Sequence, residues 1–593
     1  MIRRTFLKCL VLALSSTYLM SFRAFGEVVV GQIAKSLGLV LSTPGRVGFY
    51  IDYSELDAVG EHTFYVCRTH GTAGSVSVDF STHGDSHSQV TGTLTWGDGD
   101  ASVKSFKASV GSKGVGEHRI YAKLSNPVGG VALHNGVNTH AYGVIDDDTI
   151  APNSQAVFFD TNASLNGDGT QASPYDNIYD AIGNIGSKRY IYGKGTVIPD
   201  GTNTASIGGA FRCIAPPAGR SSEETRVYIR NWPGSSLVVD GAGASNVNGF
   251  FTEGGESYQT FRGIQFKNIN VTGVTGYNNG SAIFYHYGNS KMINIELCTA
   301  DNINGSTNDA AYNLWGVDGG KVWRCTSNNI QDNGNNTHQN TAGVFYYSST
   351  NLSIQRCEFT NSGNGIFMKR MEAGDVVASV RFNKIKTING VRYGYGSEGQ
   401  EPNYGIVQSN LFKKCNVYQA IEHTGAGRNQ KGKQWICNNV FDECGGGDNG
   451  AIRSKDTYNH QIFNNIFYNC RRTWDMAESV QYQSNQSASQ IEYANYNHEY
   501  GSTLDLYRYL SVKYTILEQI RTATGFAIND RTGDPKFINP SLEDYRLDIG
   551  SPCIGGGVAN TNQGLYLIGV EKVGLSGAAL APPPSSPEDV AVS

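Results

Sequence analysis

A short motif, in which a small residue precedes an aliphatic one, recurs at nearly regular intervals through the second half of the chain. Successive copies begin 22 to 31 residues apart, which is about the length of one turn of a β-solenoid. Turns of this length bury a continuous core when they stack, so the period predicts a parallel β-helix. The copies begin at Ala282, Gly343, Gly365, Gly390, Ala420 and Ala451, with a weaker copy at Tyr312.

A second column of residues aligns the same turns. Four asparagines each stand five positions before an apolar residue, which is cysteine in three cases. Like positions stack from turn to turn in a solenoid, so this spacing predicts an interior asparagine ladder whose amides bond to one another. The cysteines are then expected to be buried thiols of the core, although neighbouring turns could also bring two of them together. The asparagines are Asn383, Asn410, Asn439 and Asn465; Cys298, Cys325 and Cys357 take their position in earlier turns.

The chain before the repeat follows a different pattern. Between residues 28 and 150, apolar and polar residues alternate between glycine-rich turns, for example over 92–96 and 118–124. A period of two is typical of strands with one buried face. We therefore expect an antiparallel β-sandwich in this region.

Motifs in this region resemble the Calx-β family over about 110 residues. They are Gly-Thr-Leu-Thr-Trp-Gly-Asp-Gly at 92–99, Lys-Leu-Ser-Asn-Pro-Val-Gly-Gly at 123–130 and Val-Ile-Asp-Asp-Asp at 144–148. The resemblance implies a calcium-binding or adhesive sandwich. The family's acidic loop is reduced here to residues 114–117, which speaks against calcium in this domain, and we interpret the three aspartates at 146–148 as a solvated strand end.

The two ends of the repeat region carry further motifs. Residues 157–175, beginning Val-Phe-Phe-Asp-Thr-Asn, and residues 534–540 and 545–554 resemble the opening and closing segments of secreted pectate-lyase-like β-helix proteins. The resemblance spans about 157–555 and implies a right-handed parallel β-helix with capped ends. A helix is expected over 504–522. The expected fold is all-β, with a signal peptide at 1–26, a sandwich at 27–150, the β-helix at 151–570 and a proline-rich disordered tail at 571–593.

The N-terminus indicates export. Arg3 and Arg4 precede an apolar run from residue 9 to residue 22, and Ala24-Phe25-Gly26 offers small residues to a signal peptidase. Arg3-Arg4-Thr5-Phe6-Leu7-Lys8 resembles the twin-arginine signal, and an ordinary secretory signal is the alternative. Either route predicts a periplasmic or extracellular protein without a membrane span, because the apolar run is short and stands alone.

Charge limits the class of partner. The chain has 47 Lys and Arg against 52 Asp and Glu, a net charge of −5, and no basic stripe dominates it. This composition argues against a general nucleic-acid binder. We expect a monomer.

Strand alternation places a mixed patch on one outer wall of the β-helix. If Ile366 points into the core, Phe367 and Lys369 point outward. The same count in the other turns, which are about 4.8 Å apart, brings cationic, aromatic and acidic residues into one patch. The predicted outward residues are His286, Tyr347, Lys369, Arg392, Glu422, Arg453 and Lys455.

Such a patch favours an acidic polysaccharide as the partner. Arginines hold carboxylates or sulfates in a forked geometry, and aromatic rings stack on sugars. On a uronate polymer the natural reaction is β-elimination, which requires a neutralised carboxylate, a base and an acid. The resemblance to pectate-lyase-like proteins implies the same class of activity, commonly with Lys or Arg and Ca²⁺.

We predict the following roles. Lys369 is the base, and cationic neighbours at Arg370 and Arg392 would lower its pKa. Arg392, or Ca²⁺ bound to Glu422, neutralises the substrate carboxylate. The acid is Tyr347 or His423. The predicted substrate contacts are Arg370, Arg453, Lys455 and His286.

Other interpretations of the same residues stay open. The cations can be solvated surface charges, Glu422 can pair with Arg392 or Arg453, and His423 by the same count points into the core. A glycoside hydrolase needs two carboxylates at a set separation, and no outward pair stands on adjacent turns. A non-catalytic adhesive protein is the third possibility. The candidate carboxylates are Asp318, Glu398, Glu401, Glu422 and Asp456.

Overall fold

The computed structural model describes most of the chain between residues 43 and 575. The predicted signal peptide, His286, Arg370 and most of the predicted tail lie outside the described residues. The described ranges are 43–56, 60–84, 89–110, 118–134, 140–145, 150–200, 203–205, 211–242, 246–252, 254–271, 280–285, 289–305, 309–332, 341–369, 374–386, 391–394, 402–416, 419–424, 433–447, 449–455, 460–478, 491–509, 512–558, 561–567 and 571–575.

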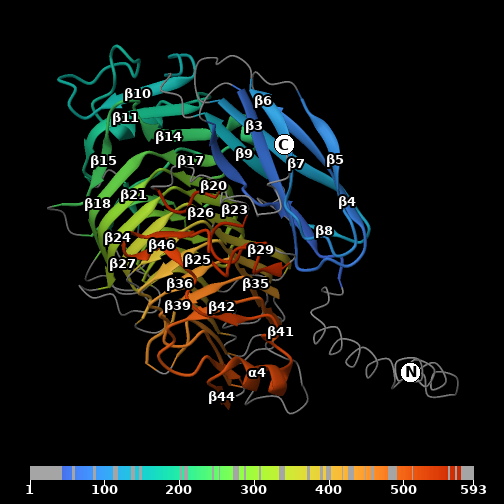
Figure 1. The fold of residues 1–593 in the computed structure, drawn as a ribbon. Coiled ribbons are helices and arrows are strands. Elements are labelled where there is room, and N and C mark those ends of the chain that lie inside the picture. Colours follow the sequence, from blue (N-terminus) through green and yellow to red (C-terminus); the bar gives the residue numbers. More distant parts are fainter. Residues whose placement is uncertain are drawn as a thin grey trace, which may run out of the picture.

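The repeat region is a solenoid of parallel strands, as Figure 1 shows. From β14 (Val227–Asn231) onward, most strands pair in parallel with the strand three places further along the chain. For example, β22 (Ala310–Trp315) pairs with β25 (Ala342–Tyr347), which pairs with β28 (Asn364–Lys369). Three strands therefore complete one turn. The predicted fold class, a parallel β-helix preceded by an antiparallel sandwich, is confirmed.

Three strands per turn give the solenoid three outer walls, which we name by what stands on them. The joint wall is the one that contacts the N-terminal domain, and we call that contact the joint. It consists of β23 (Val317–Trp323), β26 (Thr350–Gln355), β29 (Gly374–Arg381), β32 (Pro402–Gln408) and β35 (Lys433–Cys437). The amide flank consists of β18 (Ile264–Asn270), β21 (Thr299–Gly305), β24 (Thr326–Asp332) and β27 (Glu358–Ser362). The charged face consists of β25, β28, β31 (Val391–Gly394), β34 (Ile421–Thr424), β37 (Ile452–Lys455), β40 (Trp474–Glu478) and β43 (Tyr507–Tyr509).

The repeating motif lines the core as predicted, with one correction. Ile283 aligns with Tyr312 in the next turn, and Tyr312 aligns with Val344. The weaker copy therefore begins at Ala311 and not at Tyr312, because the aromatic residue takes the aliphatic position. All of these side chains are buried in one continuous core.

The interior asparagine ladder is also confirmed. The main-chain N–H and the Nδ2 of Asn383 both donate to Oδ1 of Asn410 at 3.0 Å, and Asn410 repeats both bonds to Asn439. Asn465 and Asn497 continue the ladder. Cys357 precedes Asn383 in the same column. All ten cysteines that the structure describes are free and buried, as the core-thiol interpretation predicts.

The N-terminal region forms two sheets that face each other across a hydrophobic core. One has the order β6-β3-β1-β8 and the other the order β2-β9-β7-β4-β5, and most of their neighbours are antiparallel. The core includes Phe49, Phe64 and Trp96. The strands are β1 (Arg46–Phe49), β2 (Tyr53–Leu56), β3 (Gly60–Thr69), β4 (Val76–Gly84), β5 (Thr91–Trp96), β6 (Lys104–Val110), β7 (His118–Val128), β8 (Ala132–Leu133) and β9 (His140–Ile145).

The C-terminal end corrects two boundaries. The helix expected over 504–522 is shorter: β43 and β44 (Val512–Tyr514) form a hairpin before α4 (Leu517–Thr524), because tyrosine and valine favour strands there. The packed chain also extends past residue 570. Glu571 is 1% exposed, and the main-chain N–H of Gly574 bonds to the carbonyl of Phe382. Among the described residues, no helix is both long enough and apolar enough to cross a membrane.

Candidate functional site

The sandwich covers the joint wall of the solenoid. A short segment between β1 and β2 enters this contact, and Figure 1 shows the two β-sheets of the sandwich leaning on the solenoid from one side. The Tyr53 ring packs on Trp323 with centroids 4.4 Å apart. Tyr50 packs edge-on against Phe382 and donates to Glu571 at 2.9 Å. The C-terminal segment therefore helps to hold the sandwich in place.

Buried charges in the joint satisfy one another. Lys321 is 1% exposed and its Nζ lies 3.3 Å from Oδ2 of Asp52, which is fully buried. Asp52 also accepts bonds from Ser353 and Gln355. Arg381 donates to the carbonyls of Phe49 and Tyr50. Burial lowers the pKa of Lys321, and Asp52 opposes that shift. These charged groups fix one domain on the other.

The charged face presents one outward column over consecutive turns. Its upper part is aromatic: Phe345 aligns with Phe367. Its lower part is ionic, and each residue aligns with the next one turn along. The ionic column runs Arg392, Glu422, Arg453, Asp475 and Arg508. The register predicted from sequence therefore places the described strand positions on one wall.

The aromatic part is packed rather than open. Trp315 and Tyr347 stack with centroids 4.7 Å apart, and Tyr347 is 9% exposed. Together with Phe284, Phe345 and Phe367 they form a small hydrophobic cluster outside the main core. Tyr347 points away from the solenoid core as predicted, but its ring is not a free stacking platform.

The predicted base and acid are register neighbours. Tyr347 aligns with Lys369 on the next turn, and Lys369 is half-buried. Arg453 is also half-buried, and its Nε is buried without a hydrogen-bond acceptor among the described residues. Tyr347 and Lys369 begin a second outward column, two positions further along each strand. Lys455 aligns with Thr424 in this column. His423 aligns with Tyr393 and through it with Met368, which lies in the core, so its strand position is an inward one.

Glu422 is 8% exposed and accepts a hydrogen bond from Gln419. Its register neighbours are Arg392 and Arg453, as the ion-pair interpretation requires, and Gln419 is one of its partners. Among the described residues, no group of three or more His, Cys, Asp or Glu could hold a metal ion. Ca²⁺ on Glu422 stays a prediction.

The ionic column ends in a network that the sequence did not reveal. Asp475 is fully buried, lies 3.3 Å from Arg472 and accepts 2.7 Å and shorter bonds from Arg508. Arg472 also pairs with Asp505. Burial raises the pKa of Asp475 despite these cations. In this turn Thr473-Trp474 stands where other turns have a small residue followed by an aliphatic one. The sequence motif is therefore recognisable only as far as Ala451.

Of the other carboxylates considered for hydrolysis, Asp318 is on the joint wall, where it accepts bonds from Thr350 and Asn351. Glu398, Glu401 and Asp456 lie outside the described residues.

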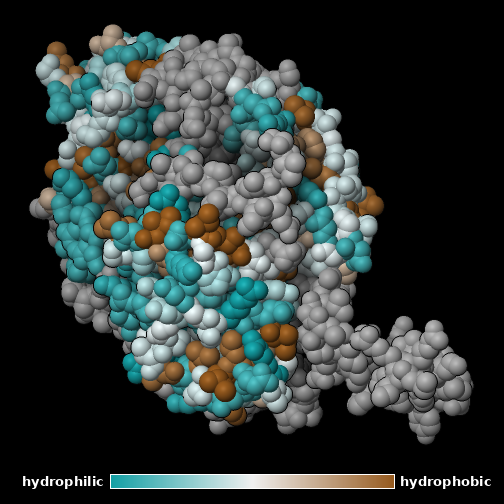
Figure 2. Space-filling view, viewed as in Figure 1, coloured by the Kyte–Doolittle hydropathy of each residue, from teal (hydrophilic) through white to brown (hydrophobic). Residues whose placement is uncertain are grey.

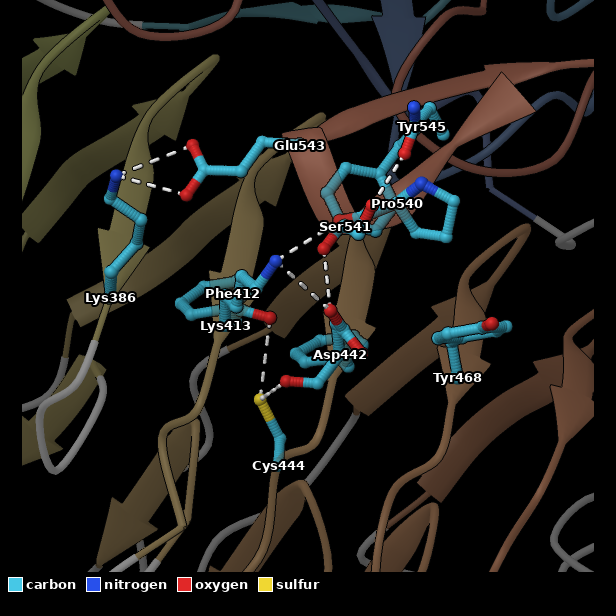
Figure 3. Close-up of polar contacts among 12 residues, drawn as sticks. Lys386, Phe412, Lys413, Asp442, Cys444, Tyr468, Pro540, Ser541, Glu543 and Tyr545 are labelled. Atoms are coloured by element: carbon cyan, nitrogen blue, oxygen red, sulfur yellow. Dashed lines mark hydrogen bonds and ion pairs between the residues drawn. The ribbon is translucent and has the colours of Figure 1, made fainter. Parts of the chain in front are cut away.

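A second titratable cluster lies under the closing segment (Figure 3). Tyr545 donates to Asp442 at 2.5 Å, and Lys413 lies 3.6 Å from the same carboxylate. Burial raises the pKa of Asp442. Lys386 pairs with Glu543 at 3.1 Å. The bonds of Tyr545 to Asp442, of Glu543 to Lys386 and of the Pro540 carbonyl to Lys413 join the closing segment to the solenoid.

Comparison with known proteins adds little. No known family matches this chain, and no curated protein matches it. The apo form of the Calx CBD1 domain is 24% identical, over 17% of this chain and 97% of that domain, with a TM-score of 0.16. The Calx CBD2 domain is 17% identical, over 18% of this chain and 87% of that domain, also with a TM-score of 0.16. Scores this low say nothing about what this chain binds.

Proposed function

We propose that the charged face binds an acidic, uronate-containing polysaccharide and that the exported chain cleaves it by β-elimination. The observation that carries the proposal is the alignment of outward positions: Arg392, Glu422 and Arg453 follow one another in one column, beside the Tyr347–Lys369 pair. A polymer lying along the solenoid would meet these positions on successive turns, about 4.8 Å apart.

The proposed roles use that alignment. Arg392 neutralises the uronate carboxylate, which makes the adjacent C–H acidic, and Lys369 removes that proton. Tyr347 gives a proton to the leaving glycosidic oxygen as its bond to carbon breaks. Arg453 supports the proposal because its half-buried side chain stands in this column, and guanidinium groups bind carboxylates and sulfates in a forked geometry.

The test is to incubate the purified protein with polygalacturonate, alginate and glycosaminoglycans and to follow the ultraviolet absorbance of an unsaturated uronate. Lys369→Ala should abolish that signal. Tyr347→Phe keeps the ring against Trp315 and should lower kcat by about 10²–10⁴.

Lys291→Ala is the matched control, because Lys291 is an exposed lysine of β20 (Ser290–Glu296), outside the charged face. Unchanged turnover in Lys369→Ala would remove Lys369 from the reaction. New reducing ends without the absorbance would indicate hydrolysis instead. Binding of the polymer without either product would indicate an adhesive protein.

A further inference from the structure

The amide flank carries a groove that the proposed lyase chemistry does not use. Its volume is about 430 Å³, within the range of small-molecule sites. Figure 2 shows hydrophilic side chains gathered over the flank that β18, β21, β24 and β27 form in Figure 1. Primary amides dominate the groove, which is lined by the side chains of Asn268, Asn270, Asn302, Asn304 and Gln331.

These amides form a ladder that runs from turn to turn on the outside of the solenoid. Asn268 donates to Asp240 at 3.0 Å, Asn302 donates to Asn268 at 2.8 Å, and Asn329 donates to Asn302 at 3.1 Å. Gln331 in turn donates to Asn329. Every bond points the same way, toward the carboxylate of Asp240. The ladder therefore holds its side chains in one orientation before any ligand arrives, which lowers the entropy cost of binding.

Much of the hydrogen-bonding capacity of this ladder is not taken up by other described residues. A primary amide has two N–H donors and an oxygen that can accept two bonds. Asn302 spends one donor on Asn268 and one acceptor position on Asn329, and it is exposed to solvent. One donor and one acceptor thus remain on the same side chain, which is the pairing that a sugar hydroxyl can satisfy.

The groove favours an uncharged ligand. None of its lining residues carries a charge. The nearest charged groups of the ladder are carboxylates, since Asp240 ends it and Asp301 accepts from Asn328 in a parallel ladder at 2.8 Å. Lys267 is paired with Asp240 at 3.1 Å. These carboxylates would repel an anionic sugar but not a neutral one.

We infer that the amide flank is a binding site for a neutral, hydroxyl-rich saccharide, separate from the charged face. The site stands on described residues of β18, β21 and β24 and does not depend on the lyase proposal. A protein with both sites would hold a neutral glycan on one wall and an acidic one on another.

Isothermal titration calorimetry of the full chain with cellohexaose, maltohexaose, mannohexaose and xylohexaose tests the inference. At least one of them should bind, and trigalacturonate should not compete for the site. Asn302→Gly should weaken that binding about fivefold to tenfold, the value of roughly one hydrogen bond. Glycine suits this position because Asn302 has φ +56°, which disfavours other residues.

Asn351→Gly is the matched control. Asn351 has φ +58°, belongs to β26 on another wall, and donates to the carboxylate of Asp318 at 3.0 Å, so it repeats the backbone and the bond of the ladder without the groove. Its binding should match the wild type. The inference fails if no hexasaccharide binds with a Kd below about 10 mM, if Asn302→Gly binds normally, or if both variants lose binding equally.

Discussion

The chain has one asparagine ladder inside the solenoid and another outside, and the two differ in how fully their amides are used. Inside, Asn410 accepts two bonds from Asn383 and donates one to Asn439 and one to the carbonyl of Val380. Every donor and acceptor of the amide is thus satisfied. Outside, the exposed Asn302 side chain makes two of its four possible bonds with other described residues. Asparagine at one position per turn thus holds the turns together inside the solenoid. Outside, it keeps a hydrogen-bond donor and an acceptor that a ligand can use.

The joint holds charged groups together in a buried contact. Ser353 and Gln355 donate to one oxygen of Asp52, and the Lys321 ammonium lies 3.3 Å from the other. The charged face resembles the outer ladder in one respect. Arg453 has a buried Nε–H donor without an acceptor among the described residues. The interior amides are thus satisfied within the fold, whereas Asn302 is exposed to solvent and can bond to a ligand.

The largest effect is expected in the joint. Asp52→Ala leaves Lys321 buried without its counter-charge and should lower the free energy of unfolding by about 3–5 kcal/mol. Chemical denaturation, followed together with proteolysis of the sandwich, measures the loss. The double variant Asp52→Ala/Lys321→Met should recover much of it, because no charge is then left buried. A double variant as unstable as Asp52→Ala alone would show that the joint does not depend on this pair.

The interior ladder should respond nearly as strongly. Asn410→Ala removes four side-chain hydrogen bonds, which Asn383 and Asn410 make with Asn410, Val380 and Asn439, and leaves the buried main-chain N–H of Asn383 without its acceptor. We expect a loss of about 2–4 kcal/mol in the free energy of unfolding. Asn416→Ala, at an exposed position on the same turn, is the control and should stay within about 0.5 kcal/mol of the wild type. Equal effects of the two changes would contradict the distinction between satisfied and solvated amides.

Sequence reasoning recovered what depends on the period and missed what depends on distant contacts. The core motif, the interior ladder from Asn383 and the free cysteines follow from residues that repeat one turn apart. In the joint, Asp52 pairs with Lys321. The two residues are far apart in sequence, and their spacing is not part of the repeat. Asp475 was missed because its turn replaces the motif with Thr473-Trp474. The outer ladder was not predicted because Asn268, Asn302 and Asn329 have positive φ, and a left-handed residue within a strand breaks simple strand alternation.

At its C-terminal end the interior ladder contains carboxyl groups, so its stability should depend on pH. Asp530 takes the asparagine position after Asn497, and the Tyr507 hydroxyl is hydrogen-bonded to both Asp530 and Glu499. Burial raises the pKa of Asp530 to about 7 and that of Glu499 well above its usual value. The folded state therefore binds protons that the unfolded state has already lost, so stability should fall as pH rises from about 4 to about 7.

Asp530→Asn removes one of these carboxylates while keeping an acceptor for Asn497. It should flatten the pH dependence and stabilise the C-terminal end at pH 8 by about 1–3 kcal/mol. Hydrogen exchange over β41 (Ile491–Asn495) at pH 5 and pH 8 provides the measurement. The control is Asp534→Asn, which changes an exposed carboxylate of the same end. A variant that keeps the pH profile of the wild type would mean that Asp530 does not hold the proton.

The smallest effect is expected on the outside, where Asn302→Gly should change the free energy of unfolding by less than about 0.5 kcal/mol. The side chain is exposed, its two bonds compete with water, and glycine accepts the positive φ at that position. Thermal unfolding of Asn302→Gly and Asn410→Ala under the same conditions compares the two ladders directly. If Asn302→Gly loses as much stability as Asn410→Ala, the outer ladder is a structural element like the inner one. Any saccharide binding lost with Asn302 would then report damage to the fold, and the amide flank would no longer stand as a separate site.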